Sequence, residues 1–254
     1  MAIQLLEKLN RQGYQQGQGE PLTSSFLVKC EISRQLIYSY CKHNWLKKRG
    51  SGVYSFPDEE ITQTGVLRAL QNQLNLNVHF GGKTAFSLFL GGIHFLAMGI
   101  SSYKIYLFCG RNTVIPQWIH SLPCFQKDTL FIYKGNPITN WDIGFLEYEN
   151  TRISSSERAI LEQLSFVGKT ETFDESFKLM EGLVHLRPDV LMDLLLHCHS
   201  IKTKRLFLYF AEKLDYSWFH QLDIAKIDLG SGPRQIVKQG VYNKKYKIVI
   251  PQDE

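Results

Sequence analysis

The sequence lacks a hydrophobic run long enough to cross a bilayer. Its longest apolar stretch, Phe86 to Met98, is interrupted by two glycines and a histidine and falls well short of the roughly 20 residues that a membrane helix needs. Residues 1–11 predict an amphipathic helix with charged side chains inside it, without the apolar core or small-residue cleavage site of a signal peptide. We therefore expect a cytoplasmic protein.

Cysteine is scarce, and no two cysteines form a CxxC pair. An odd number of scattered cysteines does not predict a disulfide framework. The densest group of potential metal ligands is His197-Cys198-His199, and adjacent side chains on an expected helix diverge instead of converging on one ion. We expect neither a metal nor a cofactor, and reduced, mostly buried thiols at the five cysteine positions, Cys30, Cys41, Cys109, Cys124 and Cys198.

Catalytic motifs such as GxSxG and HExxH are also absent. Gly81-Gly82-Lys83-Thr84 is similar to the end of a phosphate-binding loop, but the position that needs the earlier glycine is Asn77. The simplest interpretation is a glycine turn at a helix N-terminus. We predict no catalytic residue and no enzyme. The alternative is a nucleotide-using enzyme, recruited to nucleic acid, with a site near Lys83 and Thr84.

The positive charge is concentrated at one end of the sequence. Residues 1–56 contain eight basic and three acidic residues, whereas residues 57–254 contain 21 of each. The net charge of +5 therefore equals the excess in the first segment. A concentrated positive field is typical of a module that binds a polyanion.

The same N-terminal segment has a recognisable order of elements. Apolar spacing predicts a helix at Ile3–Arg11, and hydroxyl caps predict a second helix that ends at Lys29 and a third from Ser33 to about His43. Lys47–Phe56, with its Gly50-Ser51-Gly52 turn, predicts a basic hairpin. This order predicts an N-terminal winged helix-turn-helix domain over residues 1–57.

The third helix has two different faces. Ile32, Leu36, Ile37 and Tyr40 share one side, and polar side chains share the other. A helix fits the major groove, where Arg pairs with guanine and Gln with adenine, while hairpin lysines reach phosphates. The predicted DNA-binding residues are Ser33, Arg34, Gln35, Tyr38, Ser39, Lys42, Lys47, Lys48 and Arg49. The alternative is a solvated helix face beside a hairpin that contacts another protein.

Residues 58–254 predict a larger mixed α/β domain, so the whole chain is of the α+β class. Pro57 to Glu60 is expected to open a helix at Ile61–Leu74. Ser154 and Glu157 predict a capping box, and Arg158 is expected on a helix surface. The other expected elements are strands at 77–80, 104–109, 129–134, 144–148 and 246–250, a helix at 83–98, and mostly helices from 156 to 214.

Several segments resemble the AbiEi family of antitoxins. In the N-terminal domain these are Ile32-Ser33-Arg34, the stretch from Cys41 to Gly50, and Gly52-Val53-Tyr54. Two later segments, Gly81-Gly82-Lys83-Thr84-Ala85 with Leu88, and Ser155 to Leu161, follow in the order found in the family. The similarity covers most of the chain.

This resemblance implies an antitoxin and transcriptional autorepressor of a bacterial type IV toxin-antitoxin system. In that family the N-terminal domain binds inverted repeats in its own promoter. The C-terminal domain counters a nucleotidyltransferase toxin encoded beside it, generally without a stable complex. The resemblance assigns operator contacts to Arg34, Gln35, Tyr38, Ser39 and Lys42, and phosphate contacts to Lys47, Lys48 and Arg49.

Overall fold

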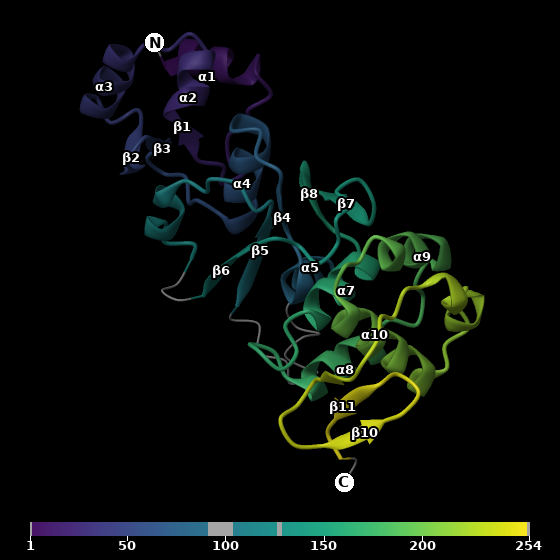
Figure 1. The fold of residues 1–254 in the computed structure, drawn as a ribbon. Helices are drawn as coiled ribbons and strands as arrows, with labels where there is room; N and C mark the ends of the chain where they lie inside the picture. The colour runs from purple at the N-terminus through teal and green to yellow at the C-terminus, as the bar shows by residue number, and fades with distance from the viewer. Residues whose placement is uncertain (1, 91–103, 126–128, 253–254) are drawn as a thin grey trace. The chain divides into compact units, whose positions relative to one another are not determined.

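The computed structural model describes residues 2–90, 104–125 and 129–252, and its helices and short strands confirm the α+β class (Figure 1). The elements up to residue 80 are α1 (Ala2–Asn10), β1 (Leu22–Thr23), α2 (Ser24–Lys29), α3 (Arg34–Lys42), β2 (Lys47–Gly50), β3 (Val53–Ser55), α4 (Gln63–Arg68), the π-helical η1 (Ala69–Gln73) and β4 (Val78–Phe80). They are followed by α5 (Gly82–Leu90), β5 (Ile105–Cys109), the 3-10 helix η2 (Gln117–Ser121), β6 (Leu130–Lys134), β7 (Phe145–Tyr148) and β8 (Thr151–Ser154). The remaining elements are α7 (Ser156–Leu164), α8 (Phe173–Glu181), α9 (Pro188–Leu196), α10 (Ile201–Leu214), the 3-10 helices η3 (Phe219–Gln221) and η4 (Ile224–Lys226), β9 (Arg234–Gln235), β10 (Val241–Asn243) and β11 (Ile248–Ile250).

The strands form four small sheets, with the orders β1-β3-β2, β4-β5-β6, β7-β8 and β10-β11-β9. The chain divides into two compact units. The first consists of Met1–His79, Cys109–Lys134 and Glu147–Thr151, and the second of Phe80–Phe108, Gly135–Leu146 and Arg152–Glu254. The domain boundary after residue 57 stays a prediction.

In the first unit, α1, α2 and α3 share one hydrophobic core, to which Leu5, Leu9, Leu27, Ile32 and Ile37 contribute buried side chains. Hydroxyl caps are present at the start of both α2 and α3; of the two candidates for α2, Thr23 and Ser24, it is Thr23 that caps the helix. The hydroxyl of Thr23 accepts a hydrogen bond from the Phe26 amide at 3.2 Å, and that of Ser33 accepts one from Leu36 at 3.2 Å. Because each cap satisfies an amide that the helix itself leaves unpaired, these side chains set where the helices begin.

The expected helix at Ile61–Leu74 begins later than predicted, because the acidic segment before it has another role. The N-cap is Thr62, and α4 runs only from Gln63 to Arg68 before it continues as η1. Glu59 is buried and accepts hydrogen bonds from the Tyr14 hydroxyl and from the amides of Gly17 and Gly19, each at 3.0 Å. The carboxylate thus organises the Gln/Gly-rich loop instead of opening a helix.

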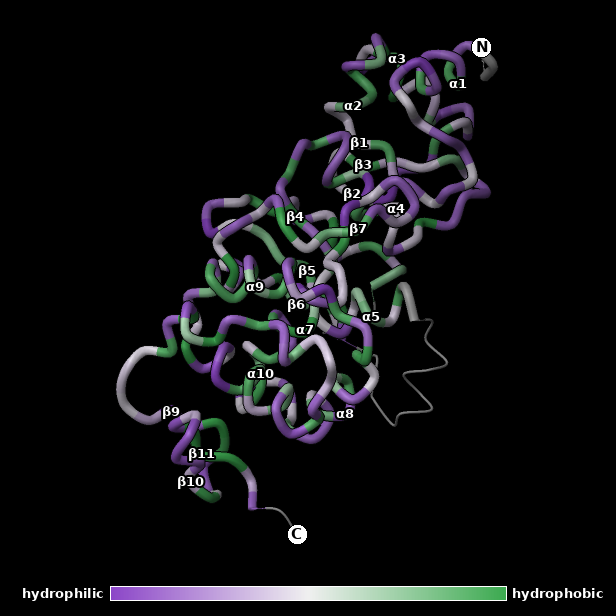
Figure 2. Tube along the Cα trace, turned by 90° about the vertical axis from the view of Figure 1, so that its right-hand side faces the viewer, coloured by the Kyte–Doolittle hydropathy of each residue, from purple (hydrophilic) through white to green (hydrophobic). Residues whose placement is uncertain are grey.

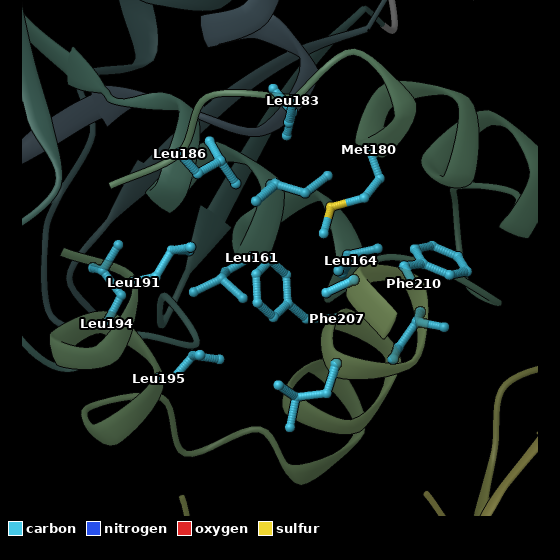
Figure 3. Close-up of a cluster of buried hydrophobic side chains, with 14 of the residues drawn as sticks. Leu161, Leu164, Met180, Leu183, Leu186, Leu191, Leu194, Leu195, Phe207 and Phe210 are labelled. Atoms are coloured by element: carbon cyan, nitrogen blue, oxygen red, sulfur yellow. The ribbon is translucent and has the colours of Figure 1, made fainter. Parts of the chain in front are cut away.

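The second unit contains the larger core (Figure 3). Its centre is made by α7 and α10, and Figure 3 shows Leu161 and Leu164 of α7 facing Phe207 and Phe210 of α10. Helices α8 and α9 add Met180, Leu191, Leu194 and Leu195. These leucines recur at helical spacing, which is why the sequence predicted helices here. Of the expected helix at 83–98, the part beyond Leu90 lies outside the described residues.

The capping box expected at Ser154 and Glu157 is wrong. The N-cap of α7 is Ser155, one residue later, and its side chain makes no capping hydrogen bond. Ser154 instead donates its hydroxyl proton to Glu162 at 2.8 Å. Arg158 was expected on a helix surface but is 0% exposed and pairs with Glu162 at 3.0 Å. The polar residues of this segment therefore face inward.

Glu157 provides a pH-dependent contribution to stability. Burial alone would raise the pKa of its carboxyl, but hydrogen bonds from Arg187 and Ser155 outweigh burial and lower the pKa from 4.5 to about 2. Two of them join Arg187 Nε and Nη2 to the two carboxylate oxygens, each at 2.9 Å. Because the folded pKa is depressed, this stabilisation is present above pH 4.5 and is lost as the pH falls towards 2.

We therefore predict that Glu157→Gln lowers the free energy of unfolding at pH 7 by about 1 to 2 kcal/mol, an effect moderated by the exposure of Arg187. The difference from the parent protein should shrink between pH 4.5 and 2, because the parent loses its carboxylate in that range. Urea denaturation at a series of pH values measures this. A difference that stays constant over that pH range contradicts the assignment.

Among the helices that the structure describes, none combines the length and the hydrophobicity needed to span a bilayer. The segment His197-Cys198-His199 follows the end of α9 and does not lie on a helix as expected. Cys198 is buried, and the two histidines beside it are exposed. Within the described ranges, no three His, Cys, Asp or Glu side chains come close enough together to hold a metal ion.

Candidate nucleic-acid interface

The exposed face of α3 carries the side chains that the sequence predicted for it. Arg34, Gln35, Tyr38 and Lys42 are exposed, with Tyr38 reaching 74%, and Ser39 is half-buried. The opposite face is in the core, where Ile32, Ile37 and Tyr40 are buried and Leu36 packs against them. The helix therefore presents long polar side chains to solvent from an anchored backbone.

The end of α3 is held by aromatic packing. The ring of Tyr40 lies 5.4 Å from that of Trp45, and the amide of Trp45 donates to the Tyr40 carbonyl at 2.8 Å. Asn44 has a positive φ of 58°, which turns the chain sharply out of the helix. Because this turn is only a few residues long, the basic strand β2 starts directly after α3.

Strands β2 and β3 form an antiparallel hairpin in which Lys47 pairs with Ser55 and Lys48 with Tyr54. Lys47 and Lys48 are exposed, and β2 has the hydrophilic colour in Figure 2. Gly52 closes the turn with a φ of +71°, a conformation that favours glycine. The hairpin thus exposes two lysine side chains, and its register shifts between Lys48 and Gly50, just before the turn.

Arg49 is placed differently from the two lysines. Its Nε donates to the Ser55 hydroxyl at 2.7 Å and its Nη2 to the Glu59 carbonyl at 3.0 Å. The side chain is half-buried. Arg49 therefore joins the hairpin to the segment that follows it, and its predicted phosphate contact stays a prediction.

Lys47 lines a pocket together with Asp58, Glu59 and Glu60, but within the described residues no salt bridge pairs the exposed basic side chains of this surface, Arg34, Lys42, Lys47 and Lys48. The segment from residue 1 to 56 carries the positive excess found in the sequence. Unpaired cations on an anchored helix and ribbon give a surface to which a polyanion is attracted.

Two features beside this surface were not predicted. Strand β1 is only two residues long and completes the sheet by pairing with β3. Helix η2 lies against the hairpin, since a Cβ at Gly50 would be 3.2 Å from the Ser121 hydroxyl and 3.4 Å from Trp118 Cβ. A groove of about 530 Å³ beside them is lined by Thr23, Ser24, Ser25, Val28, Arg34, Gly52, Leu74, Pro116 and Trp118. No local sequence signal could link Trp118 to this place, because the contact joins distant segments.

The position of α2 is fixed by a glutamine from η1. Oε1 of Gln73 accepts the Thr23 amide proton at 2.9 Å, and Nε2 of Gln73 donates to Glu20 Oε1 and to the Pro21 carbonyl, each at 2.8 Å. Gln73 is buried. These bonds hold β1 and the start of α2, against which α3 packs.

The alternative site near Lys83 and Thr84 is occupied by internal contacts. Lys83 is buried, and its Nζ pairs with Glu171 at 2.7 Å. The hydroxyl of Thr84 accepts the Tyr106 amide proton at 2.7 Å. The amide of Gly82, at the start of α5, donates to Glu162 at 3.2 Å. A carboxylate of the protein thus stands where a phosphate would bind, and the geometry does not favour a nucleotide there.

Two family models match the chain. Residues 6–98 match the "Transcriptional regulator, AbiEi antitoxin N-terminal domain" model, and residues 102–251 match the "Transcriptional regulator, AbiEi antitoxin, Type IV TA system" model. The chain belongs to the AbiEi antitoxin family. AbiEi proteins of this description are transcriptional regulators and antitoxins of type IV toxin-antitoxin systems, which confirms the family indicated by the sequence segments.

Among solved structures, this AbiEi chain is similar to the crystal structure of the RV2827C protein from Mycobacterium tuberculosis. The TM-score is 0.57 at 13% sequence identity, and the match covers 98% of this chain and 90% of that chain. At this identity the similarity concerns the fold alone. The comparison with curated proteins gave no match.

Proposed function

We propose that residues 1–57 form a winged helix-turn-helix that binds inverted repeats in the promoter of the protein's own operon and represses it. The observation that carries this proposal is the exposed polar face of α3 directly followed by the exposed lysines of the hairpin. The order of elements, three helices and a hairpin that belongs to the three-stranded β1-β3-β2 sheet, supports the same interpretation. A helix that is exposed in this way fits into the major groove of duplex DNA.

The residues divide into two roles. Arg34 and Gln35 lie in the first turn of α3, the end that approaches base edges in this motif, and their side chains match the hydrogen-bonding edges of guanine and adenine. Lys47 and Lys48 extend from the ribbon and hold phosphates. Tyr38, Ser39 and Lys42 lie along the same helix and contact the DNA backbone or bases, and Ser33 fixes the start of that helix.

We further propose that residues 58–254 form the antitoxin domain, which counters a nucleotidyltransferase-like toxin encoded beside it without a stable complex. The match of residues 102–251 to the antitoxin model supports this role. The protein acts without catalysis, because its family consists of regulators and antitoxins and because Lys83 and Thr84 are engaged internally.

Replacement of Lys48 tests the phosphate role. We predict that Lys48→Ala weakens binding to specific and unrelated duplexes alike, and that the slope of log affinity against log salt concentration decreases by about one, because one phosphate contact is lost. Gel-shift or anisotropy titrations against the upstream region, at several salt concentrations, measure both quantities.

Lys178→Ala is the matched control, because Lys178 is an exposed lysine of α8 in the second unit and its removal changes the net charge equally. This variant should keep the parent's affinity and salt slope. If Lys48→Ala and Lys178→Ala behave alike, or if the parent shows no salt-dependent affinity for duplex DNA, the hairpin does not bind DNA and the protein-contact alternative is favoured.

A further inference from the structure

A second concentration of positive charge lies near the C-terminus. Residues 229–252 contain five basic residues and no acidic residue. Acidic residues elsewhere in residues 57–254 balance this excess, so the net charge of that range is zero. The segment forms the β10-β11-β9 sheet of the second unit.

One face of this sheet is anchored in the core. Ile248 and Ile250 of β11 are buried, and β11 packs against α10. Val249, between them, points to the other face because side chains alternate along a strand. Tyr242 of β10 and Gln235 of β9 both pair with Val249 in the register, so these three residues share the outer face. Tyr242 is 46% exposed, so this aromatic residue is accessible to solvent on the outer face.

Three of the five basic residues, Lys238, Lys244 and Lys247, lie beside this outer face. Lys244 and Lys247 lie in the turn between β10 and β11. Arg234 pairs in register with the buried Ile248 and therefore belongs to the opposite face. The side-chain amide of Gln235 donates a hydrogen bond to the carbonyl of Lys238 at 2.9 Å. This bond places Lys238 beside the outer face, to which Gln235 belongs. The side chains of Lys238, Lys244 and Lys247 are exposed, and none of the three forms a salt bridge with any residue that the structure describes.

The sheet is also held rigidly. The guanidinium of Arg205 donates to the carbonyls of Leu229, Gly230 and Gly232 at 2.7, 2.9 and 2.6 Å, and to that of Lys247 at 3.1 Å. Arg205 is buried in α10. Lys245 differs from its neighbours because it pairs with Glu212. An internal arginine thus fixes the backbone that carries the exposed cations, as a binding surface requires.

We propose that this sheet binds single-stranded nucleic acid, with a base stacked on Tyr242 and phosphates held by Lys244 and Lys247. Stacking on an exposed aromatic ring within a basic surface is how single strands are bound without sequence preference. A duplex does not offer its base faces to such a ring, so the exposed tyrosine favours a single strand over a double helix. The site is distinct from the α3 and hairpin surface, and it gives the second unit a ligand of its own.

The test uses the full-length protein and fluorescein-labelled oligo-dT and oligo-U of about 15 nucleotides, within the usual range of single-strand site sizes. Anisotropy titrations should show binding that Tyr242→Ala weakens by at least about fivefold. Tyr242→Phe should retain the affinity, because the stacking ring remains. In the double variant Lys244→Ala/Lys247→Ala, the salt slope should fall by about 1.4, since a single strand contributes about 0.7 per phosphate.

Two controls separate this site from the hairpin. Lys178→Ala should bind the oligonucleotides as the parent does, and Lys48→Ala should affect duplex binding alone. The proposal is overturned if neither oligonucleotide binds, if Tyr242→Ala binds as the parent does, or if Lys48→Ala removes single-strand binding. Tyr242→Ala should leave duplex affinity unchanged. If the single-strand proposal fails, the proposal that the hairpin and α3 bind duplex DNA is therefore not affected. A preference for oligo-U over oligo-dT identifies RNA as the ligand, and the reverse identifies DNA.

Discussion

Glu162→Ala is expected to lower the free energy of unfolding by about 3 to 5 kcal/mol, the largest effect of any single change considered, because it leaves a buried arginine without its counter-charge. Oε1 of Glu162 accepts from Asn136 at 2.6 Å and from Arg158 at 3.0 Å. Oε2 accepts from Ser154 at 2.8 Å and from Gly82 at 3.2 Å. Urea denaturation followed by circular dichroism measures the loss.

The partner of Glu162 explains why the loss is large. Arg158 is fully buried, and its Nη1 donates to the carbonyls of Asn140 and Ile143 at 2.7 and 2.9 Å. Its guanidinium also lies 4.4 Å from the centre of the Phe145 ring. These contacts hold the cation in place, so it cannot move to water when the carboxylate is removed. The unsatisfied charge then carries its full desolvation cost.

The matched control is Glu181→Ala, which removes an exposed carboxylate from α8 and should change stability by no more than about 0.5 kcal/mol. The double variant Arg158→Met/Glu162→Leu should be less destabilised than the sum of its single changes, because it removes both charges together. The role of Glu162 as the counter-charge is contradicted if the stability losses of the two single changes simply add in the double variant. It is also contradicted if Glu162→Ala loses as little stability as Glu181→Ala.

The surface of α3 could be predicted from sequence because its signals are local. The hydroxyl cap at Ser33, the apolar spacing of Ile37 and Tyr40 and the glycine turn at Gly52 each act within a few residues. Such signals determine an element and its faces without knowledge of the rest of the fold. The helix bounds at Arg34 and Lys42 therefore agree with the prediction to within about one residue.

The features that sequence reasoning missed depend on contacts between distant segments. The glycine turn at Gly81 and Gly82 is present at the start of α5 as expected. Its contact with Glu162, which a side chain at Gly81 would overlap, was not predicted. Arg158 has the sequence context of a surface residue, and only tertiary packing buries it. Glu59 likewise has partners that are 40 or more residues away. A long polar side chain whose hydrogen-bond partners are distant in sequence leaves no periodic pattern. The burial of Arg158 and Glu59 therefore could not be predicted from their sequence neighbours.

Arg34→Ala is expected to cost about 1 to 3 kcal/mol of DNA affinity, and this cost should appear at one base pair of the operator. Arg34 is exposed in the first turn of α3, where a guanidinium can form two hydrogen bonds to a guanine. Removal of the side chain removes both bonds, so the parent's preference for that base is lost together with the affinity. Titrations of parent and variant against a set of operators, each with one base pair changed, measure the loss position by position.

Gln35→Ala and Lys48→Ala make the comparison decisive. Gln35→Ala should lose discrimination at a different base pair, because its side chain projects about 100° around the helix from that of Arg34. Lys48→Ala should weaken binding to every operator in the set by the same factor, since phosphates are the same in all sequences. If the three variants give the same profile, α3 and the hairpin do not divide base and phosphate contacts. If Arg34→Ala instead weakens all operators equally, Arg34 holds a phosphate from its place on the groove beside Trp118, and base recognition belongs to residues further along α3.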